Sequence, residues 1–172
     1  MDEFIIKGGN PLKGEICISG AKNAVLPIMA ASIIKPAKYT IKNVPNLKDT
    51  RTMLTIIESS GAKVDFKDNM LFIDTRFCNK PIAPYSLVKT MRASFYMLGP
   101  FMSRFNEATV SLPGGCAIGA RPVDIHLKAL SKLGVKYKIK SGYIHANAPK
   151  GLIGNIIKFP KIKLIGKKAN VR

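Results

Sequence analysis

The residues best suited to chemistry lie in one stretch, Leu112–Asp124, which reads L-P-G-G-C-A-I-G-A-R-P-V-D. Its prolines and glycines predict a strand end, a loop and a helix start, because Pro fixes φ and Gly frees it. The thiol of Cys116 therefore lies on a loop before a helix, with Arg121 nearby, and a cation and a helix start both make a thiol more reactive. Cys116 is then a nucleophile or a proton donor. A small residue in a glycine-rich turn is the equally weighted alternative.

Basic residues at two predicted helix starts could bind an anion. Lys22 and Asn23 precede an apolar helix, where exposed N–H groups, an ammonium and an amide suit a carboxylate or phosphate. Arg92 occupies a similar place in the second half of the chain, and Arg92 and Arg121 are candidates for forked contacts to phosphate oxygens. Asp124 could accept a hydrogen bond from a ligand or simply balance the dipole of its helix. For Lys22, a solvated lysine beside a helix cap is the plain alternative.

The elements that must position these residues occur twice in the same order. We expect a helix, a strand, a helix and two strands at 24–34, 38–44, 48–60, 63–66 and 70–74. The second set falls at 91–105, 108–112, 122–133, 135–139 and 143–146, with Pro100 as an internal kink or break. Two further strands are expected at 4–6 and 15–19. Hydrophobic periodicity and turn residues support this internal repeat, and the second copy carries the enlarged loop 114–121.

The bulk composition is that of an ordinary globular protein. The chain has 172 residues, 47% hydrophobic and 22% charged, which allows one domain or two small ones. No apolar run is long enough to cross a membrane, and the acidic start Met1-Asp2-Glu3 lacks the features of a secretory signal, so we expect a cytoplasmic protein. Three widely spaced cysteines favour neither a disulfide framework nor a zinc site.

The net charge is large, at +18 from 28 basic and 10 acidic residues. It favours anionic partners such as nucleotides or phosphorylated metabolites. A solvated basic surface or a lysine-rich composition explains it equally well. No aromatic series alternates with the basic residues, which argues against a nucleic-acid partner.

Three motifs carry a resemblance to a known family. They are I-S-G-A-K-N-A-V-L-P at 18–27, L-V-K-T-M-R-A-S at 87–94 and S-L-P-G-G-C-A-I-G-A-R-P-V-D-I-H at 111–126. With them the chain resembles the UDP-N-acetylglucosamine 1-carboxyvinyltransferases from Met1 to about Ile157. The resemblance implies an α/β (α+β) fold of repeated βαβαββ-type units, part of an inside-out α/β barrel of the enolpyruvyl transferase type.

The resemblance also implies a reaction. The family transfers enolpyruvyl from phosphoenolpyruvate to the 3′-hydroxyl of UDP-N-acetylglucosamine and releases phosphate, the first committed step of peptidoglycan (cell wall) synthesis. It needs no metal or organic cofactor, no nucleic acid and no membrane. By position, Cys116 is the general acid, forms a covalent adduct with the enolpyruvyl group, and is the thiol that fosfomycin alkylates. Residues matching those that hold phosphoenolpyruvate are Lys22, Asn23, Arg92 and Arg121, and residues matching those that line the UDP-sugar are Arg121, Pro122, Val123, Asp124 and Ile125.

The resemblance predicts an incomplete domain organisation. Residues 1–20 match strands of the partner domain in the full-length family, 21–158 the catalytic-loop domain, and 159–172 form a divergent basic tail. Family chains are more than twice as long, and their partner domain supplies further groups to the cleft. We expect a transferase that needs a complementing chain with the missing domain. The alternative is a truncated, inactive fragment or binding module, and a nucleic-acid-binding protein is a third hypothesis.

Overall fold

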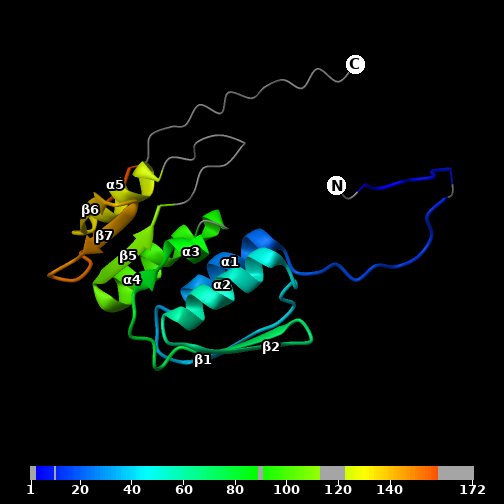
Figure 1. Ribbon diagram of the computed structural model, residues 1–172, viewed down its shortest axis with the longest axis horizontal. Coiled ribbons are helices and arrows are strands. Elements are labelled where there is room, and N and C mark those ends of the chain that lie inside the picture. Colours follow the sequence, from blue (N-terminus) through cyan, green and yellow to red (C-terminus); the bar gives the residue numbers. More distant parts are fainter. Residues whose placement is uncertain (1–2, 10, 89–90, 113–122, 159–172) are drawn as a thin grey trace, which may run out of the picture.

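Two α/β units and an extended N-terminal arm make up the described part of the chain (Figure 1). The computed structural model describes residues 3–9, 11–88, 91–112 and 123–158, with no side-chain description for residues 92–94. The arm leads directly into the first unit, and the second unit follows it in sequence.

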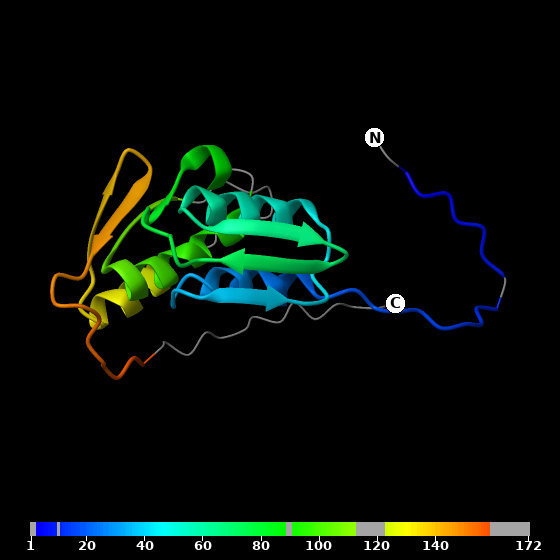
Figure 2. The same cartoon turned by 90° about the horizontal axis from the view of Figure 1, so that it is seen from below.

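The first unit is a three-stranded sheet with two helices on one face. Its elements are α1 (Lys22–Ala31), β1 (Lys38–Ile41), α2 (Lys48–Ser59), β2 (Lys63–Lys67) and β3 (Met70–Asp74). The sheet order is β1-β3-β2, and both strand pairs are antiparallel. Figures 1 and 2 show α1 and α2 packed side by side over this sheet.

The second unit repeats the first. Its elements are η1 (Arg92–Met97), α4 (Leu98–Phe105), β5 (Glu107–Ser111), α5 (Asp124–Lys132), β6 (Lys136–Lys140) and β7 (Tyr143–Asn147). The order β5-β7-β6 reproduces β1-β3-β2 with the same antiparallel pairings. The internal repeat predicted from the sequence is therefore confirmed.

The repeat extends to backbone conformation. Gly61 and Gly134 follow α2 and α5 with φ of +102° and +92°, the left-handed conformation typical of a helix C′ position. The hairpin turns at 68–69 and 141–142 also have positive φ at both residues. Such turns match the twist of the strands that they join.

The hydrophobic core runs through both units. In α2 the side chains of Met53, Leu54, Ile56 and Ile57 face inward and are buried. α1 packs against α2 and also against η1, so the two units share one core. Its largest fully buried side chains are Phe101, Met29, Ile33, Met53, Ile56, Ile57, Leu71, Ile73, Met97, Leu98, Met102 and Ile144.

Several predicted boundaries were wrong. The expected helix 91–105 divides into η1 and α4 after Met97, and Pro100 lies in the first turn of α4 rather than at a kink. A proline fits there because first-turn N–H groups have no intrahelical acceptor. The helix predicted at 24–34 runs from Lys22 to Ala31, and the strand predicted at 38–44 ends at Ile41, shortly before Asn43 with φ +54°. The helix predicted at 122–133 has its described part at Asp124–Lys132.

Two short elements precede η1 and were not predicted. β4 (Ile82–Ala83) pairs in parallel with β5 at the edge of the second sheet, and α3 (Tyr85–Val88) follows it. Each is shorter than the window in which hydrophobic periodicity can be recognised.

The strands predicted at 4–6 and 15–19 are absent. Residues 3–9 and 11–19 form an extended arm that projects from the body, without strand pairing in the described part of the chain (Figures 1 and 2). A strand requires a neighbour for its N–H and C=O groups, and the arm has none here. Its large apolar side chains are more than four-fifths exposed: Phe4, Ile5, Ile6, Leu12, Ile16 and Ile18.

Candidate functional site

The start of α1 has the backbone features of an anion site. Lys22 and Asn23 are its first two residues, whereas the sequence placed them just before the helix, and both are exposed. Ala21 at the N-cap is extended, no side chain caps the helix, and its first turn has no acidic residue. The first N–H groups of a helix lack intrahelical acceptors and carry partial positive charge, so they attract phosphate and carboxylate groups.

The ammonium of Lys22 is held by a carboxylate from the neighbouring helix. Its Nζ lies 2.8 Å from Oδ2 of Asp49, in the first turn of α2. The side chains of Lys22 and Asp49 keep 47% and 29% of their exposure, so water reaches both. An exposed pair of this kind contributes little stability, but it fixes where the ammonium lies.

The backbone before α1 is fixed by a second contact. The N–H of Gly20 donates to Oδ1 of Asn43 at 3.1 Å. A Cβ at position 20 would lie 1.9 Å from the carbonyl oxygen of Asn43, so this approach requires glycine. The next residue holds this segment on the first hairpin, because the N–H of Val44 donates to the carbonyl of Asn69 at 2.8 Å.

The other described candidates lie in the second unit. Arg92 is the first residue of η1, and its side chain is outside the described part. Val123 precedes α5, and Asp124 and Ile125 are its first residues. The exposed carboxylate of Asp124 accepts a hydrogen bond from Nζ of Lys128 at 3.3 Å. This geometry fits the dipole-balancing interpretation of Asp124, and its role toward a ligand stays a prediction.

The structure brings some candidates together and leaves others apart. η1 packs against α1, and Phe95 of η1 meets the ring of His126 in α5 edge-on, with centroids 5.5 Å apart. η1 thus links the two helices, while α5 itself lies at the far end of the body from the start of α1 (Figure 1). Cys116, Arg121 and Pro122 lie outside the described residues.

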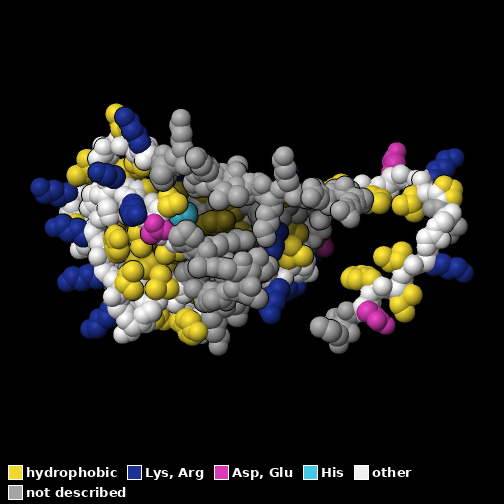
Figure 3. All heavy atoms as spheres, turned by 90° about the horizontal axis from the view of Figure 1, so that it is seen from above, with side chains coloured by type: hydrophobic (Ala, Val, Ile, Leu, Met, Phe, Trp, Pro, Cys, Tyr) yellow, Lys and Arg dark blue, Asp and Glu magenta, His cyan; other side chains and the backbone are white. Residues whose placement is uncertain are grey.

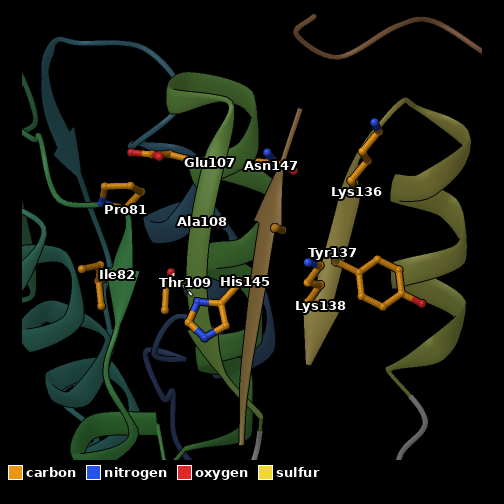
Figure 4. Close-up of a pocket in the computed structure, with 11 residues that line it drawn as sticks. Pro81, Ile82, Glu107, Ala108, Thr109, Lys136, Tyr137, Lys138, His145 and Asn147 are labelled. Carbon is orange, nitrogen blue, oxygen red and sulfur yellow. Dashed lines mark hydrogen bonds between the residues drawn. The ribbon is translucent and has the colours of Figure 1, made fainter. Parts of the chain in front are cut away.

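A hollow of about 700 Å³ lies elsewhere, on the outer face of the second sheet (Figure 4). In its centre His145 points toward Thr109, with Nδ1 and Oγ1 3.3 Å apart, while Tyr137 points away toward a helix. None of the predicted site residues lines it. Its lining residues are Pro81, Ile82, Glu107, Ala108, Thr109, Lys136, Tyr137, Lys138, His145, Ala146 and Asn147.

Positive charge gathers at the end of the body that carries α5 and β6 (Figure 3). Its exposed lysines are Lys128, Lys132, Lys136, Lys138, Lys140 and Lys150. β6 is an edge strand, and lysines along an edge oppose pairing with another chain. This cluster lies far from the start of α1, so it is a solvated basic face rather than part of the candidate anion site.

Sequence reasoning missed the partners of Lys22 and Gly20. Asp49 and Asn43 were given no role, although each fixes part of the α1 start. In the sequence, Asp49 is an ordinary acidic residue in the first turn of a helix.

The described residues also contain no helix long and apolar enough to span a membrane.

Comparison with known proteins gives one consistent result. The sequence model of "EPSP synthase (3-phosphoshikimate 1-carboxyvinyltransferase)" matches residues 6–163. A UDP-N-acetylglucosamine 1-carboxyvinyltransferase of Pelagibacter ubique is 54% identical over 95% of this chain and 39% of its own length. The protein of that name from Helicobacter pylori is 51% identical over 96% of this chain and 40% of its own. The chain thus spans about two fifths of the length of these curated relatives.

A solved structure shares the fold. The enolpyruvyl transferase NikO from Streptomyces tendae superposes with a TM-score of 0.71 and 24% sequence identity. The match covers 84% of this chain and 32% of that one. The α/β fold of the enolpyruvyl transferases, predicted from the sequence motifs, is confirmed for this part of it.

Proposed function

Since the chain belongs to the EPSP synthase family, whose sequence model matches most of its length, we propose that it carries the catalytic-loop part of a UDP-N-acetylglucosamine 1-carboxyvinyltransferase. The observation that carries this choice within the family is the identity of about one half to curated relatives of that name. The reaction belongs to peptidoglycan synthesis, and we place it in the cytoplasm.

The proposed reaction moves the enolpyruvyl group of phosphoenolpyruvate to the 3′-hydroxyl of UDP-N-acetylglucosamine. The sugar hydroxyl gives up its proton to a base as its oxygen bonds to C2 of phosphoenolpyruvate, and C3 takes up a proton from an acid. Loss of a proton from C3 then restores the double bond as the C2–O bond to phosphate breaks. No electrons are gained or lost overall, so the chemistry requires a proton donor and anion-binding groups.

The chain has candidates for both requirements. We assign Cys116 as the acid that protonates C3, the thiol that forms the covalent adduct and the target of fosfomycin. Lys22 and Asn23 are proposed to bind phosphoenolpyruvate, and the exposed start of α1 supports this because it joins an ammonium to a helix end that no side chain caps. Arg92 and Arg121 are assigned to the same phosphate, and residues 121–125 to the UDP-sugar.

The curated relatives are longer than this chain, and the additional part of their length could complete the site. We propose that residues 1–20 belong to the partner domain, that 21–158 form the catalytic-loop domain, and that a complementing chain or segment supplies the rest. The extended arm supports this, because it exposes large apolar side chains along its length, and such side chains usually pack against another surface. A cleft that closes between two domains would exclude water from the reacting groups.

Phosphate release from phosphoenolpyruvate and UDP-N-acetylglucosamine tests the proposal. The purified chain would be assayed alone and mixed with a polypeptide that corresponds to the remaining length of a curated relative. We expect release in the mixture that depends on the UDP-sugar, and its loss in Cys116→Ser. Fosfomycin should label Cys116 quickly in that mixture and poorly in the chain alone. No release in a mixture that forms a complex would favour an inactive binding module.

A further inference from the structure

The Lys22–Asp49 pair poses a chemical question, because it places a carboxylate beside a site proposed to bind anions. The two side-chain atoms are 2.8 Å apart, and both residues stay reachable by water. A lysine ammonium has three N–H donors in one charged head. Asp49 takes one of them, so two remain for a ligand.

A flexible lysine gains from such a partner. Its four-carbon side chain has considerable rotamer freedom, and binding a ligand with an unheld ammonium costs that freedom each time. Asp49 is itself anchored in the first turn of α2, which packs directly against α1. The carboxylate thus fixes the ammonium relative to the start of α1 before any ligand arrives.

A second contact fixes the backbone at the same place. The hydrogen bond from Gly20 to Asn43 and their close approach hold the residues that lead into α1. Asn43 and Asp49 flank the same turn between β1 and α2. The segment from Asn43 to the first turn of α2 therefore holds both the side chain of Lys22 and the main chain before α1.

We propose that Asp49 is a positioning residue for the anion site at the start of α1, with Asn43 holding the adjoining backbone. The inference rests on the proposed function, which takes the anion to be phosphoenolpyruvate. Asp49 touches the lysine and not the ligand. Its removal should therefore weaken anion binding even though a negative charge has been lost.

The sign of that change is the test. Simple charge repulsion predicts tighter binding of an anion to Asp49→Asn, because the site becomes more positive. Positioning predicts binding about fivefold weaker, the factor that corresponds to roughly 1 kcal/mol. Amide NMR titration of the full 172-residue chain with phosphoenolpyruvate, followed at Gly20–Ala24, measures it. Asp49→Glu, which keeps the carboxylate, should recover part of the affinity.

Asp74→Asn is the matched control. Asp74 also forms an exposed ion pair at 2.8 Å, with Arg76, and its substitution changes the net charge equally. We expect unchanged or slightly tighter binding in this variant. Equal or tighter binding in Asp49→Asn, at unchanged thermal stability, would overturn the positioning role.

A ligand-independent measurement separates this inference from the proposed function. Modification of the Lys22 amine, followed by mass spectrometry, should be faster in Asp49→Asn than in the wild type and unchanged in Asp74→Asn. If the wild type bound no phosphoenolpyruvate while this difference appeared, the proposed function would fail and the pairing would stand. Equal modification rates in all three proteins would reject the pairing itself.

Discussion

Single residues define the geometry of the α1 start, and Gly20 is the most constrained of them. Its missing side chain lets the backbone approach Asn43 so closely that a Cβ would overlap a carbonyl oxygen at 1.9 Å. The obstacle is backbone, which cannot turn aside as a long side chain does. Any larger residue must therefore move the segment that leads into α1.

Gly20→Ala is expected to reduce the free energy of unfolding by about 1–3 kcal/mol, the usual range for forced overpacking. It should also weaken phosphoenolpyruvate binding, because Lys22 and Asn23 move with the backbone. Chemical denaturation measures the first effect and NMR titration the second. Gly154→Ala is the control, since nothing lies within 4 Å of its added Cβ. Equal stability of the two variants would contradict the close approach.

The Asp74–Arg76 pair predicts a pH effect away from the site. The hydrogen bond from Arg76 lowers the pKa of Asp74 from 3.8 to about 2. A carboxyl with a lowered folded-state pKa contributes stability above pH 3.8, and that contribution is lost as the pH falls toward 2. NMR titration of the Asp74 carboxyl in wild type and Arg76→Met checks this. The pKa should return toward 3.8 in the variant, and an unshifted value in the wild type would refute the pairing.

The sequence placed Lys22 and Asn23 close to the start of α1, because helix starts leave local signals. Apolar residues follow them at helical spacing, and Gly20 precedes them. It gave no sign that Asp49 pairs with Lys22, since the two residues are 27 positions apart and meet through the packing of α1 on α2. Contacts of that kind depend on the fold, whereas helix starts depend on neighbours in the chain.

At the scale of elements, the two units solve the same structural problem with the same parts. In each unit a glycine of positive φ follows the helix, α2 or α5, that precedes a hairpin of two strands. Their surroundings differ, because a Cβ at Gly61 would lie 2.9 Å from the carbonyl oxygen of Phe77. At Gly134 the nearest atom would be 3.6 Å away, on the flexible side chain of Ile153.

Gly61→Ala should therefore be more destabilising than Gly134→Ala. Both variants place a side chain in the left-handed region, at a cost of about 1–2 kcal/mol. Gly61→Ala adds a backbone clash, so we expect its free energy of unfolding to fall by about 1 kcal/mol more. Parallel urea unfolding of the two variants measures the difference. Equal losses would show that the clash is relieved by a small shift near Phe77.

Periodicity predicted the repeated elements because each is held by contacts within its own unit. The burial that the structure shows matches the hydrophobic stripe in the sequence of α2 and the alternation in the sequences of β3 and β7. The strand expected at 15–19 has the same alternation, and the one expected at 4–6 is wholly apolar, but pairing needs a neighbour that neither pattern specifies. β4 has only two residues and no period to recognise.

At the scale of the whole molecule, a folded body and an exposed arm predict contrasting reactivity of two thiols. Cys17 is exposed in the arm, and Cys78 is 5% exposed in the first unit. In Cys116→Ser, a thiol reagent should modify Cys17 at least about tenfold faster than Cys78, which reacts only when the body opens. Mass spectrometry at short times gives both rates. Similar rates would indicate either a covered arm or an open body.

The same measurement reports on the proposed partner domain. If residues 1–20 join a sheet of a complementing chain, Cys17 should become protected when that chain is added. Protection without phosphate release would separate assembly from catalysis. Continued fast labelling in a complex that releases phosphate would show that the arm is not part of the shared structure.

The contiguity of each sheet has a consequence for synthesis on the ribosome. The strands of the first sheet lie between Lys38 and Asp74, and β5, β6 and β7 lie between Glu107 and Asn147. Neither set borrows a strand from the other, so the first sheet has all of its paired strands before the second unit has been translated. Arg104 then reaches back, donating to the carbonyl oxygens of Ile33 and Cys78. We expect co-translational folding in two steps, one for each unit. The arm, which is translated before both units, would still lack a strand partner after they have folded.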